Sequence, residues 1–248
     1  MLVNPNFIFN ISIQLYRAKI PAQDAVYIDL ILYSGIKTVY IDSKQRKGRK
    51  NIDIVKAKQR FIYICKTYIH RDGINDLLDW LEKSDFFYAP ASTKFHGNYA
   101  GGLLVHSLNV YDCLKMLIKM NNITGISDET IAIVSLFHDI CKANFYKVGT
   151  RNVKDEETGK WYKKEVYEID DSTFPIGHGE KSCIILQWFL KKLSVDELLA
   201  IRHHMGGFDN TVKGGDYSMS RAYEMCKLAV LLHLADMNAT YLLEESNG

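Results

Sequence analysis

The sequence is poor in cysteine, has no strong excess of either charge and lacks a long apolar run. Its 248 residues include five cysteines, an odd number, and no two of them stand as C-x-x-C. This argues against a disulfide framework or a zinc knuckle and is typical of a cytosolic protein with free thiols. The formal net charge is only +2, so any attraction of polyanions must come from a local patch rather than from the whole molecule.

No segment approaches the roughly 18 uninterrupted apolar residues that a membrane-spanning helix needs. The first ten residues also lack the basic stretch followed by a long apolar run that marks a signal peptide. Hydrophobic residues make up 47% and charged residues 24% of the chain, which is ordinary for a globular protein. We therefore predict a cytoplasmic protein without a membrane partner.

The hydrophobic pattern changes along the chain. Up to residue 72, short segments rich in β-branched and aromatic residues predict a small β-rich N-terminal region, with an OB-like sheet as one form of it. From residue 73 to 248, apolar residues recur at helical spacing, as in Ile74, Leu77, Leu78 and Leu81. Between about residues 145 and 170, a polar turn between two β-rich runs predicts an inserted β-hairpin. The expected fold is mostly α: a helical bundle with a small β-containing N-terminal region and this hairpin.

Several polar side chains stand inside otherwise apolar helical segments. His138 and Asp139 lie near the end of IAIVSLFHDICK, and Asp236 lies within LAVLLHLADMNATYL. Burying an imidazole or a carboxylate costs several kcal/mol unless the group is paired, hydrogen-bonded or bound to a metal. One divalent cation compensates several such groups at once, and a mixed His/Asp set suits Mn, Fe, Zn, Co or Ni.

These residues also occur in a familiar order. The sequence His106, then His138–Asp139, then Asp236 resembles the HD superfamily of metal-dependent phosphohydrolases. HDICK is similar to its HDIGK-like motif, although Cys141 stands where that motif usually has glycine. Three further segments resemble bacterial HD phosphohydrolases, including some HD-type exoribonucleases: HGNYAGGLLVHSLNVY, GHGEKS and LHLADMNATYL. The resemblance covers roughly residues 73–243.

The resemblance implies a specific set of site residues. The first ion would be held by His106, His138, Asp139 and Asp236. His178 and the adjacent pair His203 and His204 resemble the binuclear branch, which includes cyclic-dinucleotide phosphodiesterases, and imply a second ion bridged by Asp139. Adjacent helical residues diverge by about 100°, so one or both of the pair are ligands, with His204 slightly favoured. Lys142 would face the substrate phosphate as a catalytic and substrate-binding residue, together with the metal-bridging Asp139. His96 reaches the substrate mouth or simply caps a turn.

The implied function is hydrolysis of a phosphate ester by a metal-activated water, with one or two divalent ions as cofactors. The substrate is expected to be a nucleotide or a short oligonucleotide, with a cyclic dinucleotide, a nucleoside phosphate and a single-stranded 3′ end all left open. The basic segment KQRKGRK at residues 44–50 modestly favours contact with single-stranded nucleic acid. Two alternatives remain: an HD-fold di-iron oxygenase, and a non-catalytic nucleic-acid-binding module with a structural metal site. The hairpin is either a substrate lid or an inert insertion.

Overall fold

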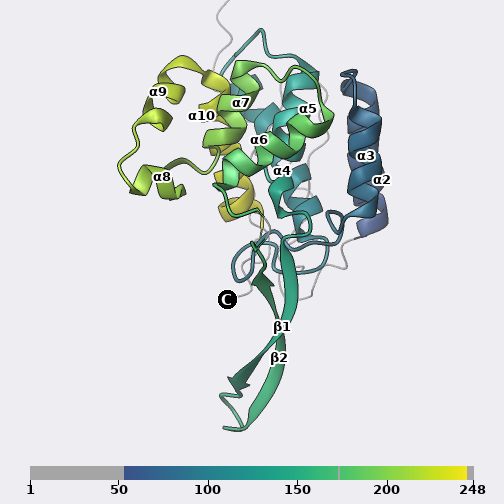
Figure 1. Cartoon of the computed structure of the whole chain (residues 1–248), viewed down its shortest axis with the longest axis vertical. Helices are drawn as coiled ribbons and strands as arrows, with labels where there is room; N and C mark the ends of the chain where they lie inside the picture. Colours follow the sequence, from purple (N-terminus) through teal and green to yellow (C-terminus); the bar gives the residue numbers. More distant parts are fainter. Residues whose placement is uncertain (1–52, 173, 245–248) are drawn as a thin grey trace, which may run out of the picture. The chain divides into compact units, whose positions relative to one another are not determined.

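The computed structural model divides the chain into two units, residues 1–52 and Asp53–Gly248, and it describes residues 53–172 and 174–244 (Figure 1). The predicted N-terminal strands and the KQRKGRK segment lie outside the described residues. The helices of the second unit are α2 (Ile54–Tyr68), α3 (Ile74–Lys83), α4 (Gly102–Met120), α5 (Asp128–Phe137), α6 (His178–Phe189), α7 (Val195–His203), α8 (Asn210–Lys213), α9 (Ser218–Met225) and α10 (Lys227–Asn238). Two short turns of 3-10 helix, η2 (Ile140–Lys142) and η3 (Gly206–Phe208), and a terminal π-helical turn, η4 (Ala239–Leu243), complete them. The prediction of a mostly α fold is confirmed.

The centre of this unit is α5, which is surrounded by other helices. Every residue from Ile131 to Phe137 is buried, so this helix has no solvent face, as its unbroken apolar sequence predicts. It begins where the Ser127 side chain accepts a hydrogen bond from the backbone N–H of Thr130, which satisfies one of the free donors at a helix start. The helix therefore delivers the residues that follow Phe137 into the interior.

The helical body begins earlier than the sequence pattern suggested. Residues up to 72 were predicted to be β-rich, but Ile54–Tyr68 is the helix α2. Its Phe61, Ile64 and Cys65 are buried at helical spacing, and the Phe61 ring packs against Phe137 with centroids 5.6 Å apart. The aromatic and β-branched residues of this segment resemble a strand in composition, but packing against α5 favours the helix, because tertiary contacts override weak local propensity.

An ion-pair network fixes the starts of two helices that lead to the polar cluster. The guanidinium of Arg71 lies 2.7 Å from Glu197 at the start of α7 and 3.3 Å from Glu129 at the start of α5. Glu197 also accepts hydrogen bonds from the Thr130 hydroxyl, at 3.0 Å, and from the backbone N–H of Ser194, at 2.8 Å. The network thus fixes the first turns of α5 and α7 relative to each other, and both helices end at the cluster described below.

The predicted hairpin is confirmed. Strands β1 (Tyr146–Lys154) and β2 (Trp161–Ile169) pair antiparallel, with a register running from Tyr146 opposite Ile169 to Lys154 opposite Trp161. It leaves the body directly after η2 and extends away from the helices (Figure 1). Within the described ranges, no helix has the length and apolar character required to cross a bilayer.

Candidate metal centre

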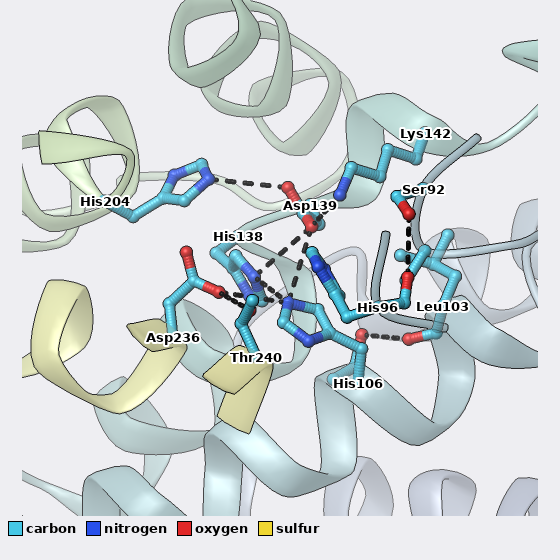
Figure 2. Close-up of polar contacts among 12 residues, drawn as sticks. Ser92, His96, Leu103, His106, His138, Asp139, Lys142, His204, Asp236 and Thr240 are labelled. Atoms are coloured by element: carbon cyan, nitrogen blue, oxygen red, sulfur yellow. Dashed lines mark hydrogen bonds and ion pairs between the residues drawn. The ribbon is translucent and has the colours of Figure 1, made fainter. Parts of the chain in front are cut away.

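Five elements bring imidazoles and carboxylates to one buried place, and Figure 2 shows His106, His138, Asp139, His204 and Asp236 within it. His138 directly follows the last residue of α5, and His204 directly follows that of α7. His106 comes from α4, His178 is the first residue of α6, and Asp236 lies in the last turns of α10. The structure therefore gathers these residues, which are distant in sequence, around Asp139.

One half of the cluster centres on His106. Its Nε2 lies 3.2 Å from Oδ1 of Asp236 and 3.2 Å from Nε2 of His138. Oδ2 of Asp139 lies 3.6 Å from the same His106 nitrogen and 3.5 Å from His138 Nε2. These four side chains make up the set that the resemblance implies for a first ion.

The other half centres on the second oxygen of Asp139. Oδ1 lies 2.5 Å from Nε2 of His178 and 3.4 Å from Nε2 of His204. The two carboxylate oxygens thus face different pairs of imidazoles. A carboxylate in this position is suited to bridge two cations, as expected for a binuclear site.

Hydrogen bonds fix which imidazole nitrogen faces the cluster. Nδ1 of His138 lies 2.8 Å from the carbonyl oxygen of Ser135, and Nδ1 of His204 lies 2.6 Å from that of Ile201. Both acceptors are carbonyls left free at the end of a helix. Nδ1 of each ring therefore donates to a carbonyl, and Nε2 of each ring is directed towards Asp139.

This arrangement fits a divalent cation. Nε2 of His204 is fully buried and has no hydrogen-bond partner within the described part of the chain. This nitrogen faces Oδ1 of Asp139 at 3.4 Å, and a cation held between the two atoms would satisfy both buried groups. Nitrogen donors combined with carboxylate oxygens suit a first-row transition ion.

Charge within the cluster keeps its acids ionised. Burial by itself raises the pKa of Asp139, but the Lys142 ammonium, 2.6 Å from Oδ2, and the neighbouring imidazoles hold it well below its usual value. Burial likewise lowers the pKa of His106, but Glu244 and Asp236 together raise it to about 10. The negative charge of these two carboxylates also favours a metal cation at His106 Nε2, which Asp236 contacts.

His96 and His203 differ in their relation to the cluster. The ring of His96 lies beside that of His106, with centroids 4.9 Å apart, and its buried Nε2 has no hydrogen-bond partner among the described residues. Burial and the neighbouring His106 lower the pKa of His96 to about 4, so it is neutral at physiological pH. It lies at the edge of the cluster, and its contact with substrate stays a prediction beside the alternative of a turn cap.

His203 does not join the cluster, and its inclusion beside His204 as a ligand needs correction. Its side chain lines a separate hollow of about 630 Å³, together with Leu199, Tyr217 and Arg221. The reason is the helical divergence of adjacent residues: when His204 points to Asp139, His203 points to the other side of α7. Of this adjacent pair, only His204 belongs to the proposed ligands.

Two functional neighbours were not predicted from the sequence. Glu244 accepts a hydrogen bond from His106 Nδ1 at 3.0 Å and another from Asn109 at 2.9 Å. Sγ of Cys141 lies 3.3 Å from Nδ1 of His178. Glu244 stands in a short polar segment after α10 with no periodic pattern, so nothing in the sequence distinguished it from a solvated residue. For Cys141, the departure from glycine in the HDICK motif was the available signal.

Comparison with known families agrees with this geometry. The family model of the HD domain matches residues 103–239. The chain belongs to the HD-domain family. The matched range contains His106, His138, Asp139, His178, His204 and Asp236, whereas His96 and Glu244 lie outside it. No curated protein and no solved structure matched the chain.

Proposed function

We propose that this HD domain is a metal-dependent phosphohydrolase that cleaves a phosphate ester of a nucleotide or short oligonucleotide. Membership of the family places it among proteins that are generally metal-dependent phosphohydrolases. The observation that carries the finer proposal is the position of Lys142, whose ammonium lies 2.6 Å from the central carboxylate of Asp139. A buried cation beside a metal site is suited to bind an anionic substrate.

The protein residues have separable roles in this proposal. His106, His138, Asp139 and Asp236 would hold a first divalent ion, and Asp139, His178 and His204 a second. When bound, such ions polarise a phosphoryl oxygen and acidify water. Asp139 stays ionised because of its neighbours and so keeps its charge available to the cations.

Lys142 and His96 would act on the substrate. Lys142 is nearly buried, and burial strengthens its electrostatic effect on a phosphoryl oxygen relative to a cation in water. His96 is neutral and has one unpartnered nitrogen, so it can accept or donate one hydrogen bond without adding charge. Lys142 favours phosphohydrolase chemistry over the di-iron oxygenase alternative, in which an anion-binding cation has no evident role.

The proposal is tested by metal analysis and turnover of the purified protein and two variants. Asp139→Asn removes the charge of the central carboxylate, and Asp79→Asn makes the same change at an exposed position of α3. We expect the wild-type protein and Asp79→Asn to retain metal and to hydrolyse bis-p-nitrophenyl phosphate, whereas Asp139→Asn loses both with an unchanged helical circular dichroism spectrum.

Near-normal turnover of Asp139→Asn would rule out the metal mechanism, and an O₂ requirement of the wild-type reaction would favour the oxygenase. Cyclic dinucleotides, nucleoside phosphates and single-stranded RNA or DNA, assayed with the same three proteins, then identify the substrate class.

A further inference from the structure

The outer part of the hairpin is exposed on both faces. From Thr150 to Glu165, every residue is exposed except Val153 and Asp155, which are half-buried. Trp161 retains 69% and Tyr162 48% of its surface. A two-stranded ribbon without a core against either face is marginally stable by itself, so its exposed side chains do not serve the packing of the body.

The outer part of one face of this ribbon carries two cations directly opposite each other. The register sets Arg151 opposite Lys164 and Val153 opposite Tyr162. Strand residues two positions apart share a face, so these four side chains form one patch, which we call the ribbon patch. Like charges directly opposite each other destabilise a strand pair. No carboxylate among the described residues forms an ion pair with Arg151 or Lys164.

The acids of the hairpin lie outside the ribbon patch. Glu168 shares its face but lies nearer the base, opposite Lys147, with its carboxylate over Gly149. Glu165 is on the opposite face of β2, because it adjoins Lys164 in the strand. Glu156 and Glu157 lie in the turn between the strands. The Asp155 side chain stabilises this turn by accepting hydrogen bonds from the backbone N–H groups of Glu157 and Thr158. The ribbon patch therefore combines two unpaired cations with the exposed aromatic ring of Tyr162.

The base of the ribbon contacts the edge of the metal centre. β1 begins shortly after Lys142, and the Tyr146 hydroxyl donates a hydrogen bond to the carbonyl of Ala91 at 3.3 Å. Ala91 belongs to the loop that carries His96, in which the Ser92 hydroxyl donates to the His96 carbonyl at 2.8 Å. From this base, the nine residues of β1 extend about 30 Å at roughly 3.3 Å per residue.

We infer that the ribbon patch binds the part of a single-stranded nucleic acid that extends beyond the phosphate at the metal centre. Arg151 and Lys164 contact backbone phosphates, which also neutralises the repulsion between the two cations. Tyr162 stacks against a base, an interaction open to any sequence. The location of the scissile phosphate rests on the proposed function, whereas binding of the strand by the ribbon patch does not.

Binding is measured without turnover, in the Asp139→Asn background, by fluorescence anisotropy of a labelled single-stranded dodecamer in RNA and DNA form. Arg151→Gln/Lys164→Gln removes both cations of the ribbon patch. Lys191→Gln/Lys213→Gln makes the same change of net charge at two exposed lysines of the helical body. Because the first pair of changes relieves a like-charge contact, it is not expected to unfold the hairpin.

We expect the ribbon variant to bind the dodecamer about tenfold more weakly and with a smaller salt dependence, and the body variant to change Kd less than twofold. Tyr162→Ala should also weaken binding of the dodecamer, but not binding of polyglutamate or anionic vesicles. With active protein, the ribbon variant should raise the KM for the dodecamer about tenfold more than the KM for bis-p-nitrophenyl phosphate.

Equal affinities of the ribbon and body variants would overturn the inference. Normal binding of the dodecamer by Tyr162→Ala would also overturn it, because Tyr162 would then not contact a base. An equal loss of affinity of Tyr162→Ala for polyglutamate or vesicles would overturn it too, because the patch would then be a general anion or membrane contact. The wild-type protein could hydrolyse no phosphate ester while the ribbon variant still binds the dodecamer more weakly. The proposed function would then be wrong, but the binding of a strand by the ribbon patch would be supported.

Discussion

Lys142 and Asp139 form a buried ion pair, with the ammonium nitrogen 2.6 Å from one carboxylate oxygen. The same carboxylate faces four imidazoles through its two oxygens. Breaking a buried ion pair usually destabilises a protein, because one charge is left uncompensated. Here a divalent cation offers the carboxylate a second source of compensation, which makes Lys142 available to an anionic substrate.

Replacing Lys142 by Ala should lower kcat by roughly 10²-fold or more, in the range found when one electrostatic contact to a transition state is removed. Metal content should remain, because removal of a neighbouring cation does not weaken the attraction between Asp139 and a divalent ion. Inductively coupled plasma mass spectrometry and initial rates measure the two effects separately. Lys213→Ala, at an exposed lysine of α8, is the matched control. Loss of metal from Lys142→Ala would show that Lys142 supports the site structurally.

Replacing Glu244 by Gln should weaken metal binding about 10- to 100-fold, as is usual when the partner of a ligating histidine is changed. The Glu244 carboxylate accepts a hydrogen bond from Nδ1 of His106 and so keeps Nε2 directed into the cluster. Competition with a chelator gives the affinity. Glu224→Gln changes an exposed residue of α9 in the same way and should bind metal normally. Equal affinities of the two variants would contradict this role of Glu244.

The adjacent histidines after α7 should respond differently to substitution. His204→Ala should lower the bound metal, because its unpartnered Nε2 faces Asp139. His203→Ala should retain the full metal content, because its side chain lines a separate hollow. Metal analysis of the two variants side by side is sufficient. If His203→Ala loses metal and His204→Ala does not, the assignment of the pair is inverted.

Arg71→Ala should destabilise the protein by about 3 kcal/mol, because it leaves Glu197 buried with no cationic partner. Glu197 is fully buried, with 0% of its side chain exposed, whereas the Arg60–Asp112 pair is about half exposed. Arg60→Ala should therefore cost less than about 1 kcal/mol. Urea unfolding with an unchanged m-value gives both numbers. Similar losses in the two variants would show that burial of Glu197 does not determine the effect.

From the Arg71–Glu197 pair we also expect the stability of the protein to fall at acid pH. Burial raises the pKa of Glu197, but hydrogen bonds from Arg71 and the Ser194 backbone lower it below its usual value overall. The stabilisation is therefore present above the pKa of the unfolded state and is lost as pH falls through the lower pKa of the folded state. Glu197→Gln should be less stable than wild type at pH 7 and should lose less stability below about pH 4. Parallel stability curves would contradict this.

Much of the fold and most of the cluster could be predicted, because each of these sequence patterns is compatible with only one arrangement of buried and exposed residues. A histidine and an acid directly after the apolar helix α5, and Asp236 within α10, require compensation wherever the helices pack. The hairpin could also be predicted, because two β-rich segments flank a polar turn.

The errors have physical causes as well. The segment around Phe61 has strand-like composition, but its packing against Phe137 and other buried rings favours the helix. The choice between His203 and His204 depends on where α7 ends, which sequence does not resolve to a single residue. Glu244 is brought to His106 by the path of the chain after α10, and no local pattern encodes that contact.

The central claim is that these side chains share divalent cations around Asp139. Anomalous diffraction from crystals of the protein loaded with Mn²⁺ tests it most directly. The predicted result is a peak between Asp139 and the side chains of His106, His138 and Asp236, with a second between Asp139 and those of His178 and His204. A map without a peak next to Asp139, or with the metal bound elsewhere, would contradict the claim.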